Sequence, residues 1–139
     1  MGSSLFCVGK QLLQVSSTQR IDSPRFLDRI NRMGRMFACR SEAGQAISHE
    51  IEASGLRVQQ ESPLKVRYRD QVVGDFFADL LIEDELIVEL KSVERLAKIH
   101  EAQLVNYLVA TGIEVGLLIN FGSTGVDVKR KYRTAKEKQ

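Results

Sequence analysis

The chain has 139 residues and a formal net charge of +2, with 43% hydrophobic and 27% charged residues, as in a globular protein with one modest core. No apolar run approaches the roughly 20 residues of a membrane span, and the first residues lack the basic and apolar regions of a secretory signal. Cys7 and Cys39 have no CxxC partner, which favours free thiols in a cytoplasmic protein over a structural zinc site.

Residues 1–40 are predicted to form an extension that precedes the main domain. Ser23-Pro24 resembles a helix start, because proline is tolerated at the first helical position. The apolar side chains of this extension are too many to leave in water, so we expect them either to pack on the core or to join subunits of a homo-oligomer. They are Phe26, Leu27, Ile30, Met33, Met36 and Phe37.

Residues 41–132 alternate between helical and strand patterns, as one α/β domain with a mixed sheet flanked by helices would. Gly55 and Gly112 are suited to end the two helices. The predicted elements, in chain order, are a helix at 41–54, strands at 64–69, 74–82 and 86–93, a helix at 95–111, and strands at 115–121 and 126–132.

The chain ends in a basic segment, of which residues 133–139 are predicted to form a tail. From Lys129 onward there are six basic residues against one acidic residue, Glu137. Such a segment can neutralise nucleic-acid phosphates, and the alternative is a solvated terminus. The basic residues are Lys129, Arg130, Lys131, Arg133, Lys136 and Lys138.

Three charged residues interrupt the predicted central strands. Glu89 and Lys91 share one face of the strand at 86–93, and Asp79 lies in the apolar run before it. Burying such charges is costly unless they are paired, hydrated or bound to a metal. The alternative is a structural ion pair on the wet face of an antiparallel sheet.

Strand parity decides whether the two carboxylates can share a metal ion. Asp79 and Glu89 lie opposite each other on one face only if Ile82 opposes Leu86 across a three-residue loop. Their Cβ atoms would then be about 5 Å apart, close enough for both carboxylates to bind one Mg²⁺ or Mn²⁺. Lys91 would orient a water molecule or stabilise charge developing on a phosphate.

The helix at 95–111 places Gln103 and Tyr107 on one face. Beside a carboxylate pair, these two side chains are suited to positioning a substrate backbone, and the alternative is that they cover the sheet edge. His100 shares this face and is expected to support the site rather than bind metal.

At these residues the chain resembles the GxxExxY proteins, a branch of the PD-(D/E)XK nuclease-like superfamily. The resemblance covers about residues 44–132 and rests on four blocks in order, at 74–81, 87–94, 100–108 and 116–122. It implies a restriction-endonuclease-like αβββαβ core with Asp79, Glu89 and Lys91 in the catalytic positions. Gln103-x-x-x-Tyr107 resembles a motif of recombination-associated exonucleases.

The motif that names this family is degenerate here. Its Gly, Glu and Tyr fall on Phe37, Arg40 and Ala43, and only Glu42 is near enough to substitute for the helical carboxylate. Two hypotheses follow from this departure. The chain is a Mg²⁺-dependent nuclease that acts on DNA in preference to RNA, with weak or lost activity, or it is a non-catalytic scaffold that self-assembles into a homo-oligomer or serves as a binding module.

Overall fold

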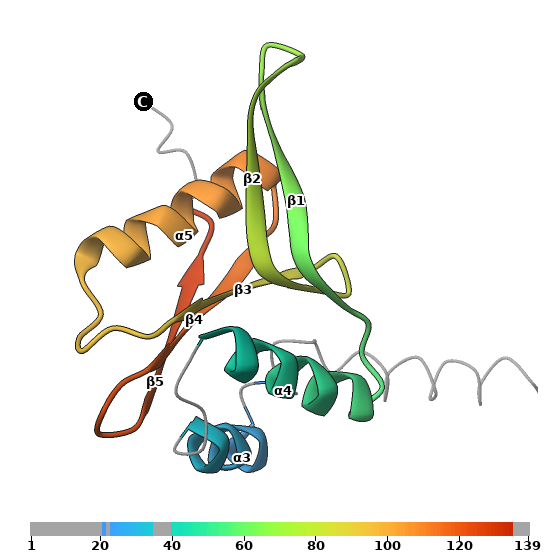
Figure 1. Ribbon diagram of the computed structural model, residues 1–139. Coiled ribbons are helices and arrows are strands. Elements are labelled where there is room, and N and C mark those ends of the chain that lie inside the picture. Colours follow the sequence, from blue (N-terminus) through green and yellow to red (C-terminus); the bar gives the residue numbers. More distant parts are fainter. Residues whose placement is uncertain (1–20, 22, 35–39, 135–139) are drawn as a thin grey trace, which may run out of the picture.

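The computed structural model describes residues 21, 23–34 and 40–134 (Figure 1). Cys7, Met36, Phe37, Cys39 and the basic residues of the tail after Thr134 lie outside this part of the chain. The elements are the helices α3 (Pro24–Gly34), α4 (Arg40–Ala53) and α5 (Lys98–Thr111), and the strands β1 (Val58–Tyr68), β2 (Gln71–Ile82), β3 (Leu86–Lys91), β4 (Val115–Phe121) and β5 (Val126–Tyr132).

The five strands form one sheet in the order β1-β2-β3-β4-β5. Every neighbouring pair is antiparallel except β3 and β4, which are parallel and joined through α5. In Figure 1, α5 lies on one side of the sheet, while α3 and α4 lie on the other. The predicted mixed sheet and its αβββαβ order are therefore confirmed.

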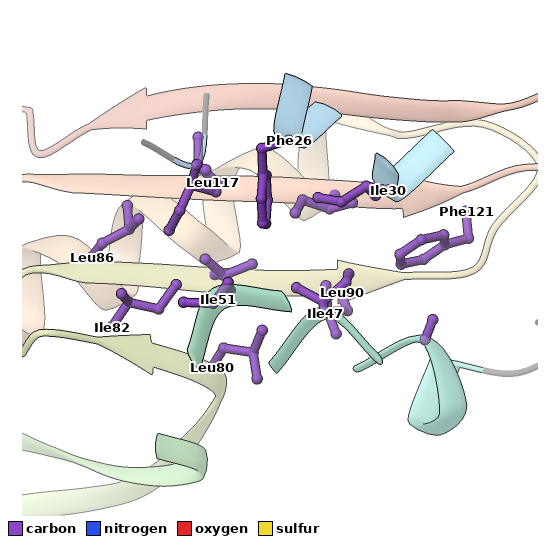
Figure 2. Packing of buried hydrophobic residues seen from close by; sticks show 14 residues of the cluster. Phe26, Ile30, Ile47, Ile51, Leu80, Ile82, Leu86, Leu90, Leu117 and Phe121 are labelled. Carbon is purple, nitrogen blue, oxygen red and sulfur yellow. The ribbon is translucent and has the colours of Figure 1, made fainter. Parts of the chain in front are cut away.

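The larger core lies between the sheet and the two N-terminal helices. Phe26 and Ile30 of α3 and Ile47 and Ile51 of α4 pack there against buried residues of β2, β3 and β4 (Figure 2). The Ser23 hydroxyl accepts a hydrogen bond from the Phe26 N–H at 3.3 Å, which caps α3 at the predicted start. Phe26, Ile30 and Met33 of α3 thus pack on the core of their own chain.

The smaller core lies beneath α5. Leu104 and Leu108 of this helix pack against Ile87 of β3 and Leu118 of β4. The helix begins at Lys98 rather than at the predicted Arg95, and the N–H of the preceding residue donates to the His100 Nδ1 at 3.0 Å. Its end at Gly112, with a φ of 77°, is as predicted.

A buried asparagine ends β3 two residues earlier than the sequence pattern predicts. The Asn120 side chain accepts from the Val93 N–H and donates to the Val93 carbonyl oxygen, both at 2.9 Å. These bonds occupy the backbone groups that would otherwise continue the sheet ladder. They also hold the segment that follows Lys91 against the end of β4.

The β1–β2 hairpin projects beyond the other strands (Figure 1). Its turn at Arg69 and Asp70 has φ values of 47° and 66°, as in the primed turns that suit two-residue hairpins. β1 begins at Val58, six residues before the predicted start at Leu64. This polar stretch can form a strand because it lies at the edge of the sheet and pairs only with β2. Within the described residues, none of the helices is both long and apolar enough to cross a bilayer.

Candidate active site

Asp79 and Glu89 meet where β2 and β3 separate. The ladder between these strands runs from Ile82↔Leu86 to Leu80↔Val88, which is the register that the parity argument requires. Beyond it, the Asp79 N–H donates to the Glu89 Oε1 at 3.3 Å, and the Leu90 N–H donates to the Asp79 Oδ2 at 2.8 Å. Each carboxylate therefore accepts a backbone N–H of the opposite strand, and the predicted three-residue loop is confirmed.

These two hydrogen bonds compensate for the burial of the Asp79 and Glu89 carboxylates. The Glu89 residue is only 6% exposed, and Asp79 is half-buried. A carboxylate removed from water needs hydrogen-bond donors, and charge-assisted bonds are the stronger kind. The backbone N–H groups freed by the separation of the strands supply such donors.

The separation coincides with a break in strand alternation. Leu80 belongs to the core under α3 and α4, whereas Ala78, two residues earlier, belongs to the core under α5. On the neighbouring β1, Glu61 has a φ of 47°, and the pairs on either side are Gln60↔Leu80 and Ser62↔Ala78. Irregularities of this kind re-aim side chains and are frequent beside active sites.

A hollow of about 120 Å³ opens beside Asp79. Its wall is formed by two residues of α4, Gly44 and Gln45, two of β1, Gln60 and Glu61, and the buried Leu80 and Leu90. Gly44 allows the close approach of the helix, because a Cβ at this position would lie 3.1 Å from the Leu90 Cδ1. Sequence reasoning did not identify Gln45, Gln60 or Glu61.

The helical wall of this hollow carries no carboxylate, and Glu42 of α4 is exposed. Across residues 21, 23–34 and 40–134, no three His, Cys, Asp or Glu side chains are close enough to hold an ion by themselves. The carboxylates of Asp79 and Glu89 still fit Mg²⁺ or Mn²⁺, since Mg²⁺ prefers oxygen ligands, keeps several waters and commonly binds through one or two carboxylates together with substrate oxygens.

Lys91 begins a chain of contacts that reaches the surface of α5. Its Nζ donates to the Gln103 Oε1 at 3.5 Å, and the Gln103 Nε2 donates to the Tyr107 hydroxyl at 2.9 Å. The Tyr107 ring lies against Phe76 of β2, with ring centres 5.5 Å apart and planes tilted by 47°. The structure therefore brings Gln103 and Tyr107 together with Lys91, and adds Phe76, which the sequence pattern did not single out.

The basic segment is partly neutralised within the chain. Lys129 and Lys131 of β5 both pair with Glu101 of α5, and Arg133 pairs with Glu114. Hydrogen bonds from the two lysines lower the pKa of Glu101 from 4.5 to about 2. These lysines tie the edge strand to the helix, which leaves less of their charge for an external phosphate.

Comparisons with known proteins agree with this fold. A family model described as PD-(D/E)XK nuclease superfamily matches residues 30–132. The solved structure titled "Crystal structure of SSO0001" is similar in fold, with a TM-score of 0.54 and 15% sequence identity. The similarity covers 70% of this chain and 51% of that chain, so this chain spans about half its length. No curated protein sequence matches.

Proposed function

Because the chain belongs to the PD-(D/E)XK nuclease superfamily, we propose that it is a metal-dependent phosphodiesterase that hydrolyses DNA in the presence of Mg²⁺. The observation that carries this proposal is the meeting of Asp79 and Glu89 where β2 leaves β3, each held by a backbone N–H of the other strand. Within the superfamily, we assign the chain to the GxxExxY branch, on the strength of the four ordered sequence blocks around these residues.

In this proposal, Asp79 and Glu89 hold the ion. An ion held by these carboxylates would supply a water of lowered pKa and positive charge for the scissile phosphate. Lys91 lies on the Glu89 face of β3, where its ammonium can stabilise the charge that develops on the phosphate oxygens. Gln103 positions Lys91 by accepting its hydrogen bond, and Tyr107 holds the Gln103 amide from its other end.

The test is the change of Asp79 to asparagine, which keeps the size of the side chain and removes its charge. We expect Mg²⁺-dependent cleavage of DNA to fall by about a thousandfold, since such interactions supply several kcal/mol and each 1.36 kcal/mol is tenfold in rate. Mn²⁺ binding, measured by calorimetry, should also weaken.

Asp75→Asn is the matched control, because Asp75 is an exposed carboxylate on the same strand. It should leave both cleavage and Mn²⁺ binding unchanged. Equal loss in the two variants, or equal Mn²⁺ heats in Asp79→Asn and the parent, would refute Asp79 as a metal ligand.

One observation favours the rival function of a non-catalytic, self-assembling scaffold. The helical wall of the hollow beside Asp79 offers Gly44 and Gln45 where a third carboxylate would strengthen metal binding. A protein that shows no cleavage with Mg²⁺ or Mn²⁺ and a native mass of several subunits by light scattering would support the scaffold and overturn the nuclease.

A further inference from the structure

A second hollow, of about 290 Å³, lies between α5 and β2. Four of its lining residues form one stripe along α5, spaced so that they share a face of the helix. They are Gln103, Asn106, Tyr107 and Ala110, and Phe76 of β2 forms the remaining wall. The hollow therefore combines two aromatic rings with two side-chain amides.

This combination suits a flat heteroaromatic group. Phe76 remains 42% exposed even though its ring contacts Tyr107, so part of an aromatic surface is open beside the hollow. The Asn106 amide is exposed and offers both a donor and an acceptor, which are the groups that read the edges of a base. Aromatic side chains beside such amides are the usual elements of nucleobase recognition.

Gln103 connects this hollow to Lys91. It lines the hollow and also accepts the hydrogen bond of Lys91, the residue assigned above to the phosphate. A nucleotide whose phosphate lies at Lys91 would therefore have its base beside the stripe of α5 that Gln103 begins. One residue contacts both Lys91 and the hollow, so the hollow lies next to Lys91.

We propose that the hollow lined by Phe76 and Tyr107 binds an unpaired nucleobase of the substrate, so that the protein acts on single-stranded DNA. This inference rests on the proposed function. In a duplex, stacking covers the faces of each base and pairing occupies its edge. Only an unpaired base can present a face to Phe76 and an edge to Asn106 together.

The test compares three DNA probes in EDTA, so that no strand is cut: a single strand, the same strand with abasic sites, and the duplex. Affinity is measured by fluorescence anisotropy for the parent and Phe76→Leu. We expect Phe76→Leu to weaken binding of the normal single strand about fivefold or more, the lower end of the contribution of base–aromatic stacking. Binding of the abasic strand should not change, because its phosphates are the same.

Phe77→Leu is the matched control, since Phe77 is the adjacent aromatic residue on β2 and is 61% exposed without lining the hollow. It should bind all three probes as the parent does. Tyr107→Leu tests the other ring independently and should reproduce the loss, whereas Tyr107→Phe, which keeps the ring, should retain most of the affinity. If Phe76→Leu does not fold, quenching of 2-aminopurine in a strand bound to the parent protein reports the same stacking.

Equal affinity of the parent, Phe76→Leu and Tyr107→Leu for the normal single strand would overturn the proposal. An equal loss on normal and abasic strands would also overturn it, because the ring would then support the fold or the phosphate contacts. A protein that binds unpaired bases in this way but never cleaves DNA would refute the proposed hydrolysis without contradicting the nucleobase site.

Discussion

Gln45 is the residue whose identity bears most directly on metal binding. It lines the hollow beside Asp79 from α4, where it presents an amide. Gln45→Glu would add a carboxylate from α4 to the wall, and a hard divalent ion binds more tightly as the charge of its ligands rises. We expect Mn²⁺ affinity, measured by calorimetry, to rise by about tenfold, with faster cleavage in Mg²⁺.

Glu42→Asp serves as the control for Gln45→Glu, because Glu42 is exposed on the same helix and does not line the hollow. It should leave Mn²⁺ affinity unchanged. Unchanged affinity in Gln45→Glu would show that α4 contributes nothing to the metal site.

Glu101 makes the stability of the protein depend on pH. Its pKa is held at about 2 in the folded chain by hydrogen bonds from Lys129 and Lys131, against an ordinary value of 4.5. The folded state therefore gains stability from the ionised carboxylate above about pH 4.5, and loses this gain as the pH falls towards 2. Glu101→Gln should lower the urea midpoint at pH 6, and its difference from the parent should shrink steadily between about pH 5 and pH 2.

A carboxyl group away from the two lysines provides the comparison for Glu101. Glu85 lies in the exposed turn between β2 and β3, so Glu85→Gln should follow the parent at every pH. A difference between Glu101→Gln and the parent that stays constant down to pH 2 would contradict the assignment of this pH dependence to Glu101.

The hairpin that carries Asp79 and Glu89 could be predicted from sequence because strand parity is a local property. The three-residue loop sets the register from Ile82↔Leu86 to Leu80↔Val88, and Asp79 and Glu89 follow directly beyond this ladder. Gln45 and Glu61 could not be found in this way, because the hollow exists only where α4 and β1 approach Asp79 in space. Phe76 was missed because the alternation along β2 breaks between Ala78 and Leu80.

At the scale of elements, the close packing of α5 on β4 depends on Gly116. A Cβ at this position would lie 2.7 Å from the Leu104 Cδ1, and Leu104 is fully buried, with little room to move. Gly116→Ala should therefore reduce the free energy of unfolding by about 1–3 kcal/mol, as overpacking of a core does. Urea denaturation measures this loss.

A double-mutant cycle tests whether Leu104 is the side chain responsible. Leu104→Ala alone leaves a cavity, but the same change in the Gly116→Ala background removes the clash. The double mutant should therefore lose clearly less stability than the sum of the losses of the two single mutants. Strict additivity would mean that Gly116→Ala acts through the backbone and not through α5.

The accuracy of the predicted elements follows how strongly each is buried. The bounds of β4 were predicted correctly because its apolar run is covered on both faces, and those of β5 because turn residues and alternation define it. The early part of β1 was missed because its polar residues lie on an edge strand and have no apolar pattern. β3 was predicted too long because a distant side chain, Asn120, takes over the backbone groups of Val93.

At the scale of the whole molecule, α3 belongs to the core and is not an appended segment. Ile30 is fully buried against α4 and the sheet, and Ile21 and Phe26 lie in the same cluster. Ile30→Ala should lower the free energy of unfolding by about 2–5 kcal/mol, the usual cost of truncating a buried aliphatic side chain. Removal of residues 1–36 should lower the melting temperature further.

Arg25→Ala, an exposed change on the same helix, should have little effect on stability. Light scattering of Ile30→Ala should give the native mass of the parent, since Ile30 packs within its own chain. A fall in native mass without a fall in melting temperature would instead make this helix a contact between subunits.

The position of β3 in the middle of the sheet has a consequence for how the protein folds. Its contacts with β2 close over a three-residue loop, so this hairpin can form within microseconds. Its parallel partner β4 arrives only after the whole of α5, and such non-local pairing is slow. We therefore expect Asp79 and Glu89 to meet early, in a hairpin not yet covered on its β4 side, while the hollow beside Asp79 appears only when α4 closes over it in the completed fold.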